Sequence, residues 1–167
     1  FNIVAQSSES TVVTEYKPQS NRSEAYQSEA DLEREFIRLL CELGYERLTI
    51  HKEADLITNL RTQLEKLNNY YFTDGEWKRF WDEVLANTNS GILEKTRLIQ
   101  EDYVQVLRRD NGESKNIQLI DKKCIHNNGL QVINQYAISA EEGAAHDNRY
   151  DVTVLVNGLP LIHIELK

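Results

Sequence analysis

The chain has 167 residues, of which 40% are hydrophobic and 28% are charged, and its formal net charge is −8. This length favours one domain with a sizeable core, and no apolar run approaches the roughly 20 residues that span a bilayer. No basic segment followed by an apolar core opens the sequence, so no secretory signal is predicted. The acidic balance disfavours a free-standing nucleic-acid binder, which usually carries a basic stripe.

Residues 1–27 are polar and rich in serine, and they predict a flexible N-terminal arm with one extended stretch, "TVVTEYKP". The sequence begins with Phe and contains no Met, so we expect it to be a piece of a longer chain. Cys41 and Cys124 lie far apart, which predicts neither a zinc site nor a disulfide framework. Cys41 falls near the core face of the first helix, where we expect it to pack.

Three helices are predicted from apolar residues spaced three and four apart. The first spans 28–44, with Ser28 at its N-cap and Gly44 as its stop. The second spans 54–68 with a leucine face. The third begins at Thr73, where the spacing of Thr73 and Glu76 is that of a capping box; its aromatic face is predicted to be core, or a docking surface if the helix is exposed: Trp77, Phe80, Trp81.

After about residue 100 the apolar period changes from 3.6 to 2, which predicts strands. Two of them, 103–109 and 116–121, flank the turn residues Asp110-Asn111-Gly112, and a third covers 130–138. A last hairpin, 150–167, turns at Asn157-Gly158. Helices followed by a largely antiparallel sheet predict an α+β fold, or part of a mixed α/β one.

The last hairpin can be aligned through its apolar residues. The valines of its first strand share one face, and the isoleucines of its second strand share one face. Matching these faces with a three-residue loop, 157–159, places Val152 opposite Ile164 and Asp151 opposite Glu165. A two-residue turn would instead bring the valines opposite the polar residues, which burial disfavours. Directly opposed residues have Cβ atoms about 5 Å apart, so two carboxylates are predicted to face each other.

Two opposed carboxylates repel, and a divalent cation resolves the conflict. Mg²⁺ takes oxygen ligands from one or two carboxylates together with water and phosphate, and Lys167, two residues beyond Glu165, could orient an attacking water. The triplet Glu-x-Lys is weak evidence because it occurs four times, but only the last copy lies on an apolar strand with an Asp on its hairpin partner. A solvated polar face without any metal is the competing interpretation.

The phrase "NRYDVTVLVNGLPLIHIELK" resembles the PD-(D/E)xK nuclease superfamily, and within it the N-terminal nuclease domain of the restriction (motor) subunit of type I restriction enzymes. The segments "YQSEADLEREFIRLLCELGYE", "GILEKTRLIQEDYV" and "VINQY" are similar to the same subunit in order and spacing. The resemblance covers nearly the whole chain from about residue 26.

This resemblance implies a restriction-endonuclease-like core and Mg²⁺-dependent cleavage of double-stranded DNA in a prokaryotic cytoplasm. Asp151 and Glu165 would be the metal ligands, and Lys167 the catalytic lysine. In the family, methyltransferase and specificity subunits are partners, and ATP is used by a translocase region of the parent chain. Residues 28–167 would be the N-terminal part of the nuclease domain, truncated at its lysine. A helix that follows this lysine in the family, with a Gln-x-x-x-Tyr motif, and any phosphate-binding loop are absent from the sequence.

Several further residues are candidates for smaller roles. Glu29, in the first turn of the first helix, could be an accessory or third carboxylate, and Glu33 is a weaker candidate for the same role. The dipole of the helix would favour a glutamate there without any function. His163 shares the polar face of Glu165 and is expected to flank the site rather than bind metal. Three residues that precede Asp151 in the sequence could contact a DNA phosphate: His146, Asn148, Arg149.

Two other functions remain open at this level. One is another PD-(D/E)xK nuclease, such as a DNA repair or resolvase enzyme. The other is a non-catalytic docking domain whose acidic hairpin face meets a basic partner. A docking face would not need Mg²⁺, so metal dependence separates the last alternative from the first two.

Overall fold

The structure, a computed structural model, describes residues 2–6, 12–15, 28–50, 52–87, 91–138 and 148–166. Its helices are α1 (Glu29–Glu42), α2 (Glu53–Asn68), α3 (Asp74–Phe80), the π-helical η1 (Trp81–Leu85), α4 (Ile92–Gln100) and the short 3-10 helix η2 (Ile125–Asn127). Its strands are β1 (Asn2–Gln6), β2 (Val12–Glu15), β3 (Glu46–Arg47), β4 (Val104–Arg108), β5 (Ser114–Gln118), β6 (Leu130–Ile138), β7 (Asn148–Val156) and β8 (Leu159–Ile164). The fold is α+β, as predicted.

The main sheet has four strands in the order β3-β6-β7-β8. Strands β6, β7 and β8 form an antiparallel meander, which confirms the predicted hairpin and third strand. The short β3 runs parallel to β6 and was not predicted. Two further hairpins, β1–β2 and β4–β5, pair separately from this sheet. The Asp110-Asn111-Gly112 turn joins β4 to β5, as predicted.

Helix α1 begins where the sequence predicts, because Ser28 caps it: the Ser28 hydroxyl oxygen accepts a hydrogen bond from the backbone N–H of Asp31. The helix covers one face of the sheet, where Ile37 packs with Val132 and Val152. The predicted packing of Cys41 is wrong. Residues 41–43 form the last turn and are all exposed, because the buried stripe of the helix ends before them.

A second core lies between α2, α3 and the β4–β5 hairpin. Its buried members come from these elements, from the residues just before α3 and just after β5, and from the first residue of β8: Leu60, Leu64, Phe72, Phe80, Leu107, Ile117, Leu119, Leu159. Trp77 and Trp81 pack against this cluster, so the aromatic face of the third helix belongs to the core. The predicted capping box between Thr73 and Glu76 is present. After Phe80 the helix widens into the π-helical η1, in which the backbone N–H of Ala86 donates to the carbonyl of Trp81, five residues earlier.

Glu76 is buried next to this second core, and its carboxylate accepts three hydrogen bonds. Its carboxylate accepts hydrogen bonds from the backbone N–H groups of Thr73 and Asp110 and from the Tyr70 hydroxyl. Burial raises the pKa of Glu76, but these hydrogen bonds outweigh it and hold the pKa below its ordinary value. A charged Glu76 therefore links the start of α3 to the β4–β5 turn.

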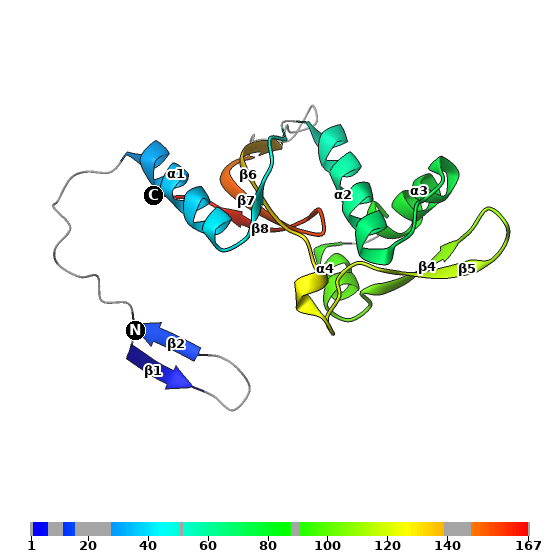
Figure 1. Ribbon diagram of the computed structural model, residues 1–167, viewed down its shortest axis with the longest axis horizontal. Coiled ribbons are helices and arrows are strands. Elements are labelled where there is room, and N and C mark those ends of the chain that lie inside the picture. Colours follow the sequence, from blue (N-terminus) through cyan, green and yellow to red (C-terminus); the bar gives the residue numbers. More distant parts are fainter. Residues whose placement is uncertain are drawn as a thin grey trace.

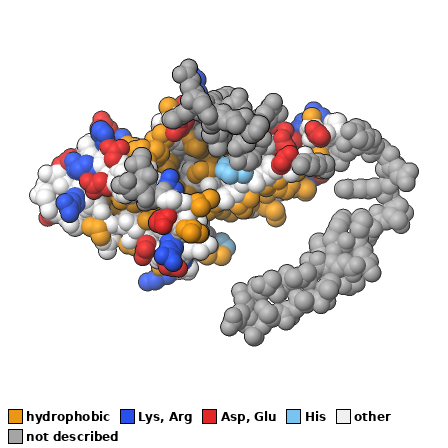
Figure 2. Space-filling view, turned by 180° about the vertical axis from the view of Figure 1, so that it is seen from behind, with side chains coloured by type: hydrophobic (Ala, Val, Ile, Leu, Met, Phe, Trp, Pro, Cys, Tyr) orange, Lys and Arg blue, Asp and Glu red, His pale blue; other side chains and the backbone are white. Residues whose placement is uncertain are grey.

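Figure 1 shows α1 and the four-stranded sheet toward one end of the molecule, and α3 with the β4–β5 hairpin toward the other. The β7–β8 hairpin connects the two ends, since its strands pack under α1 while Leu159 enters the second core. Figure 2 shows hydrophobic side chains gathered across the middle of one face, with charged side chains to either side. In the described part of the chain, no helix is long and apolar enough to cross a membrane.

Candidate active site

Asp151 lies on β7 one residue before the buried Val152. Because side chains alternate along a strand, Asp151 projects from the face opposite to α1. The carboxylate is half-buried, and its Oδ2 accepts a hydrogen bond from the backbone N–H of Leu166 at 2.8 Å. This bond reaches across to the chain just beyond β8, so it fixes the orientation of the Asp151 carboxylate relative to the partner strand.

Glu165 directly follows the last residue of β8 and is exposed. The predicted pairing of Val152 with Ile164 is confirmed. This pair is the last of the ladder, and Asp151 and Glu165 are the next residues along the two chains. The bond from Leu166 to Asp151 shows that the two chains remain adjacent over this step. Lys167 lies outside the described residues, so its proposed role stays a prediction.

The predicted three-residue loop of this hairpin is wrong. Val156 pairs with Leu159, so Asn157 and Gly158 form a two-residue turn with positive φ angles of 51° and 81°, as hairpin turns of this length require. The register then shifts between Val154 and Leu155, where β8 contains an extra residue. This β-bulge restores the alignment of the apolar faces, so Val152 pairs with Ile164 as predicted even though the turn is shorter.

The turn is anchored rather than exposed, which is unusual for a hairpin tip. Asn157 is 1% exposed, and its side chain accepts a hydrogen bond from the Gly129 N–H and donates to the Leu119 carbonyl and Asn128. A Cβ atom on Gly158 would lie 2.6 Å from the Cα of Leu60 on α2. The closed end of the hairpin is therefore held by α2 and the segment 119–129, while the open end carries the two carboxylates.

The accessory candidates on α1 lie toward the same end of the sheet. Glu33 is buried, and it accepts a hydrogen bond from the Asn134 amide of β6 at 2.9 Å. Asn134 pairs with Val152, the neighbour of Asp151. Glu29 is exposed one helical turn earlier. No group of three or more acidic, His or Cys side chains in the described ranges is arranged to hold a metal ion, so the structure does not bring Glu29 or Glu33 together with the carboxylate pair.

A second polar pair lies on the same hairpin, closer to its turn than the carboxylates. Thr153 and His163 are directly opposed on β7 and β8, and Thr153 Oγ1 is 3.0 Å from His163 Nδ1. Partial burial lowers the pKa of His163, which favours the neutral ring. Sequence reasoning placed His163 on this face but did not connect it to Thr153. The predicted register would have done so, because the alignment that pairs Val152 with Ile164 also pairs these two residues.

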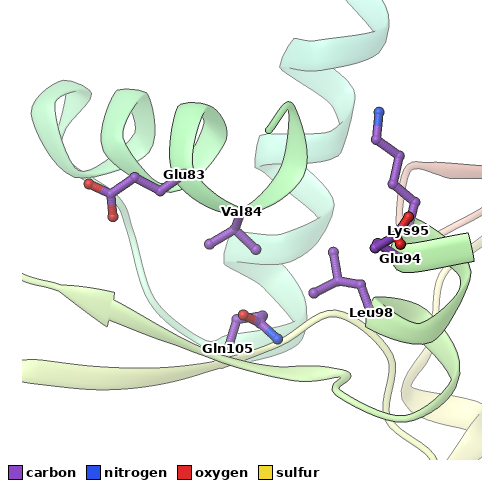
Figure 3. A pocket seen from close by; sticks show the side chains of 6 residues that line it. All are labelled: Glu83, Val84, Glu94, Lys95, Leu98 and Gln105. Atoms are coloured by element: carbon purple, nitrogen blue, oxygen red, sulfur yellow. The ribbon is translucent and has the colours of Figure 1, made fainter. Parts of the chain in front are cut away.

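The remaining candidates give no further support. His146 lies outside the described residues, as do the side chains of Asn148 and Arg149, whose backbone begins β7. A cavity of about 150 Å³ lies between η1, α4 and β4 (Figure 3), where Val84, Leu98 and Gln105 point toward one another. It contains none of the predicted site residues. This cavity is therefore separate from the candidate site.

The donor set fits a hard divalent cation. Two carboxylates from neighbouring strands supply oxygen ligands, which Mg²⁺ prefers. The hydrogen bond to Asp151 occupies one of its two carboxylate oxygens. Glu165 follows the end of the adjacent strand and is exposed to solvent.

Comparison with known proteins gives a consistent result. Residues 26–167 match the family model described as "Type I restriction enzyme R protein N terminus", and this match starts where the resemblance was expected to start. The chain is 44% identical to the "Type I restriction enzyme EcoprrI endonuclease subunit" of Escherichia coli. The alignment covers 98% of this chain and 51% of the relative.

Staphylococcal proteins are also similar. The chain is 38% identical over 86% of its length to the "Type I restriction enzyme SauMSSORF170P endonuclease subunit" of Staphylococcus aureus, and 36% identical over 85% to the "Type I restriction enzyme SsaAORF53P endonuclease subunit" of Staphylococcus saprophyticus. It spans about half of the E. coli relative and 15% of these two. The chain therefore belongs to the family of type I restriction enzyme R proteins, of which it represents the N-terminal region.

Proposed function

We propose that this region carries a Mg²⁺-dependent endonuclease site that cleaves phosphodiester bonds of double-stranded DNA. The observation that supports this most strongly is the β7–β8 register, which directs Asp151 and Glu165 to the same strand end in a member of a restriction-subunit family. Like charges directly opposed on two strands are destabilising, and a divalent cation bound by both carboxylates would offset this repulsion.

The roles of the individual residues follow from their positions. Asp151 and Glu165 hold the cation, and the Leu166 N–H keeps the Asp151 carboxylate oriented toward it. When bound, Mg²⁺ supplies Lewis-acid stabilisation of the charge that develops on the phosphate. Lys167 is placed by the sequence two residues beyond Glu165, where its ammonium group orients the attacking water and stabilises negative charge.

The wider activity belongs to a longer protein. We infer that the parent subunit hydrolyses ATP in another region and works with methyltransferase and specificity subunits, as type I restriction enzymes do. DNA gripping by those other parts is compatible with the net charge of −8 on this chain. Residues 28–167 would then be the N-terminal part of the nuclease domain, with residues 1–27 as an arm in front of it.

A matched pair of glutamates tests the metal site. Glu165→Gln in the full subunit, assembled with its partners and ATP on plasmid DNA, is expected to lower cleavage by more than the 10–100-fold typical of residues that only support a metal ligand. Glu113→Gln is the control, because Glu113 also belongs to a Glu-x-Lys triplet but lies in the β4–β5 turn, paired with Arg109. Cleavage should be measured over a range of Mg²⁺ concentrations. Equal loss in both variants would contradict the proposed site.

A further inference from the structure

One edge of the main sheet carries backbone groups that have no partner among the described residues. Strand β3 forms this edge, and Arg47 pairs with Val132 of β6 in parallel. In this geometry the bonds are made by the neighbours of Arg47, such as the N–H of Leu48, which donates to the Val132 carbonyl at 2.9 Å. The N–H and C=O groups of Arg47 therefore point away from β6. Thr49, two residues later, makes no backbone hydrogen bond to another described residue. Both residues are exposed, so this edge is a template for a further strand.

A groove of about 310 Å³, called the edge groove below, lies between this edge and α2. The segment 48–50 forms one wall, and side chains of α2 at helical spacing form the other: Asp55, Thr58, Asn59, Thr62. Both walls are fixed on the sheet, because Ile50 is buried in a cluster with Ile133 and the Asn59 amide donates a hydrogen bond to Gln131 of β6 at 2.9 Å. In Figure 1 the cyan segment that contains β3 runs between α1 and α2.

The helical wall of the edge groove presents hydrogen-bond acceptors. Asp55 is the charged residue of the lining, and it forms no ion pair with another described residue. The hydroxyl groups of Thr58 and Thr62 donate to the backbone carbonyls one turn earlier, so their oxygen atoms remain as acceptors. A carboxylate beside acceptor oxygens suits the donor groups of a Lys or Arg side chain. An anionic ligand such as DNA is disfavoured, because none of the described residues that line the groove is basic.

A free strand edge beside a helix is a surface that binds extended peptides by strand addition. We propose that the edge groove binds an extended segment of a partner subunit of the restriction complex, which pairs with Arg47 and Thr49 and directs a Lys or Arg side chain to Asp55. Strands β3 and β8 are opposite edges of the sheet, so a partner bound at β3 leaves the open end of the β7–β8 hairpin free. Covering the edge on assembly also removes a template for self-association. The proposal rests on the assembly inferred above and not on the nuclease chemistry.

Four variants of the full subunit test the proposal through their affinity for the complex of methyltransferase and specificity subunits. Asp55→Lys reverses the charge in the edge groove. Glu53→Lys is its matched control, because both acidic residues lie in the first turn of α2 but Glu53 does not line the groove. Thr49→Pro removes the N–H from the strand edge, and Thr49→Val keeps it. The Kd is measured by surface plasmon resonance with the partner complex immobilised, and urea unfolding checks that each variant is folded.

We expect Asp55→Lys to raise the Kd about 10-fold, because an attraction becomes a repulsion, and Glu53→Lys to change it less than about twofold. Thr49→Pro should raise the Kd about 5–10-fold more than Thr49→Val, as for the loss of one hydrogen bond. If Thr49→Pro is unfolded, the comparison of Asp55→Lys with Glu53→Lys decides. Equal Kd values for those two variants would overturn the proposal, as would equal values for folded Thr49→Pro and Thr49→Val.

Photo-crosslinking identifies what occupies the edge groove. The full subunit with Thr49→benzoylphenylalanine is assembled with its partner subunits and irradiated, and cross-linked peptides are identified by mass spectrometry. We expect a cross-link to a segment of a methyltransferase or specificity subunit that contains Lys or Arg. A cross-link confined to the R subunit itself, a cross-link to a second copy of it, or no cross-link at all would overturn the proposal.

The binding assay also separates this inference from the function proposed above. If the wild-type subunit does not bind the partner complex, the inferred assembly fails and this proposal fails with it. If wild type binds and all four variants bind alike, the edge groove is wrong and the assembly stands. The nuclease site is tested separately, because cleavage is not measured in this assay.

Discussion

Replacing Gly158 with alanine tests how the hairpin that carries the carboxylates is anchored. Gly158 has a φ of +81°, and its added Cβ would lie 2.6 Å from the Cα and 3.0 Å from the N of Leu60. The left-handed backbone costs an alanine about 1–2 kcal/mol, and forcing atoms into a packed site costs about 1–3 kcal/mol more. We therefore expect Gly158→Ala to lower the free energy of unfolding by about 2–5 kcal/mol, a large part of the stability of a typical domain.

Gly112→Ala is the matched control. Gly112 has nearly the same φ, +83°, but no atom lies within 4 Å of its added Cβ, so only the backbone cost of about 1–2 kcal/mol applies. Urea unfolding followed by the fluorescence of Trp77 and Trp81, which pack on the second core, compares the two variants. Equal destabilisation by both substitutions would refute the close packing of the turn on α2.

Other predictions concern the buried polar residues. Glu76→Gln should lower the free energy of unfolding at pH 7 by about 1–3 kcal/mol, because hydrogen bonds formed by a charged acceptor are lost. Since the folded-state pKa of Glu76 is lowered, its contribution is present above the ordinary value of 4.5 and is lost as pH falls through the folded pKa. The difference between wild type and Glu76→Gln in urea unfolding should therefore shrink below about pH 4.5; a difference that is constant with pH would contradict this. Asn157→Gly keeps the positive φ but removes three hydrogen bonds to the segment 119–129, and we expect a loss of about 2–4 kcal/mol in the same assay. A loss below about 0.5 kcal/mol would mean that these bonds do not anchor the turn.

Local sequence patterns predicted most elements of this fold. The helix spans around α1 and α2 and the strand β6 follow from apolar periodicity, and their ends follow from Ser28 and from turn residues. Helix α4 was not predicted, and none of its residues is buried in the structure. The parallel pairing of β3 with β6 was also missed, since two residues give too short a signal.

Some features of the candidate site were also predictable from the sequence, and others were not. Matching the valine and isoleucine faces was enough to predict the pairing of Val152 with Ile164. A register shifted by one residue would turn the apolar side chains of one strand to the opposite face, which burial disfavours. Turn length was not predictable from that match, since a β-bulge can absorb the extra residue anywhere between the turn and Val154. The hydrogen bond between Glu33 and Asn134 joins residues about a hundred positions apart. The pattern of apolar residues in either segment does not predict this bond.

Asp151 is proposed to belong to a metal-dependent nuclease site. The most direct test of this claim is Asp151→Ala in the full subunit, with its partner subunits, ATP and Mg²⁺, on supercoiled plasmid DNA, with cleavage and ATP hydrolysis followed in the same reaction. We predict that cleavage is lost while ATP hydrolysis continues, because the carboxylate serves the nuclease site alone. Cleavage at the wild-type rate would contradict the claim and leave the polar end of the β7–β8 hairpin as a solvated or docking surface.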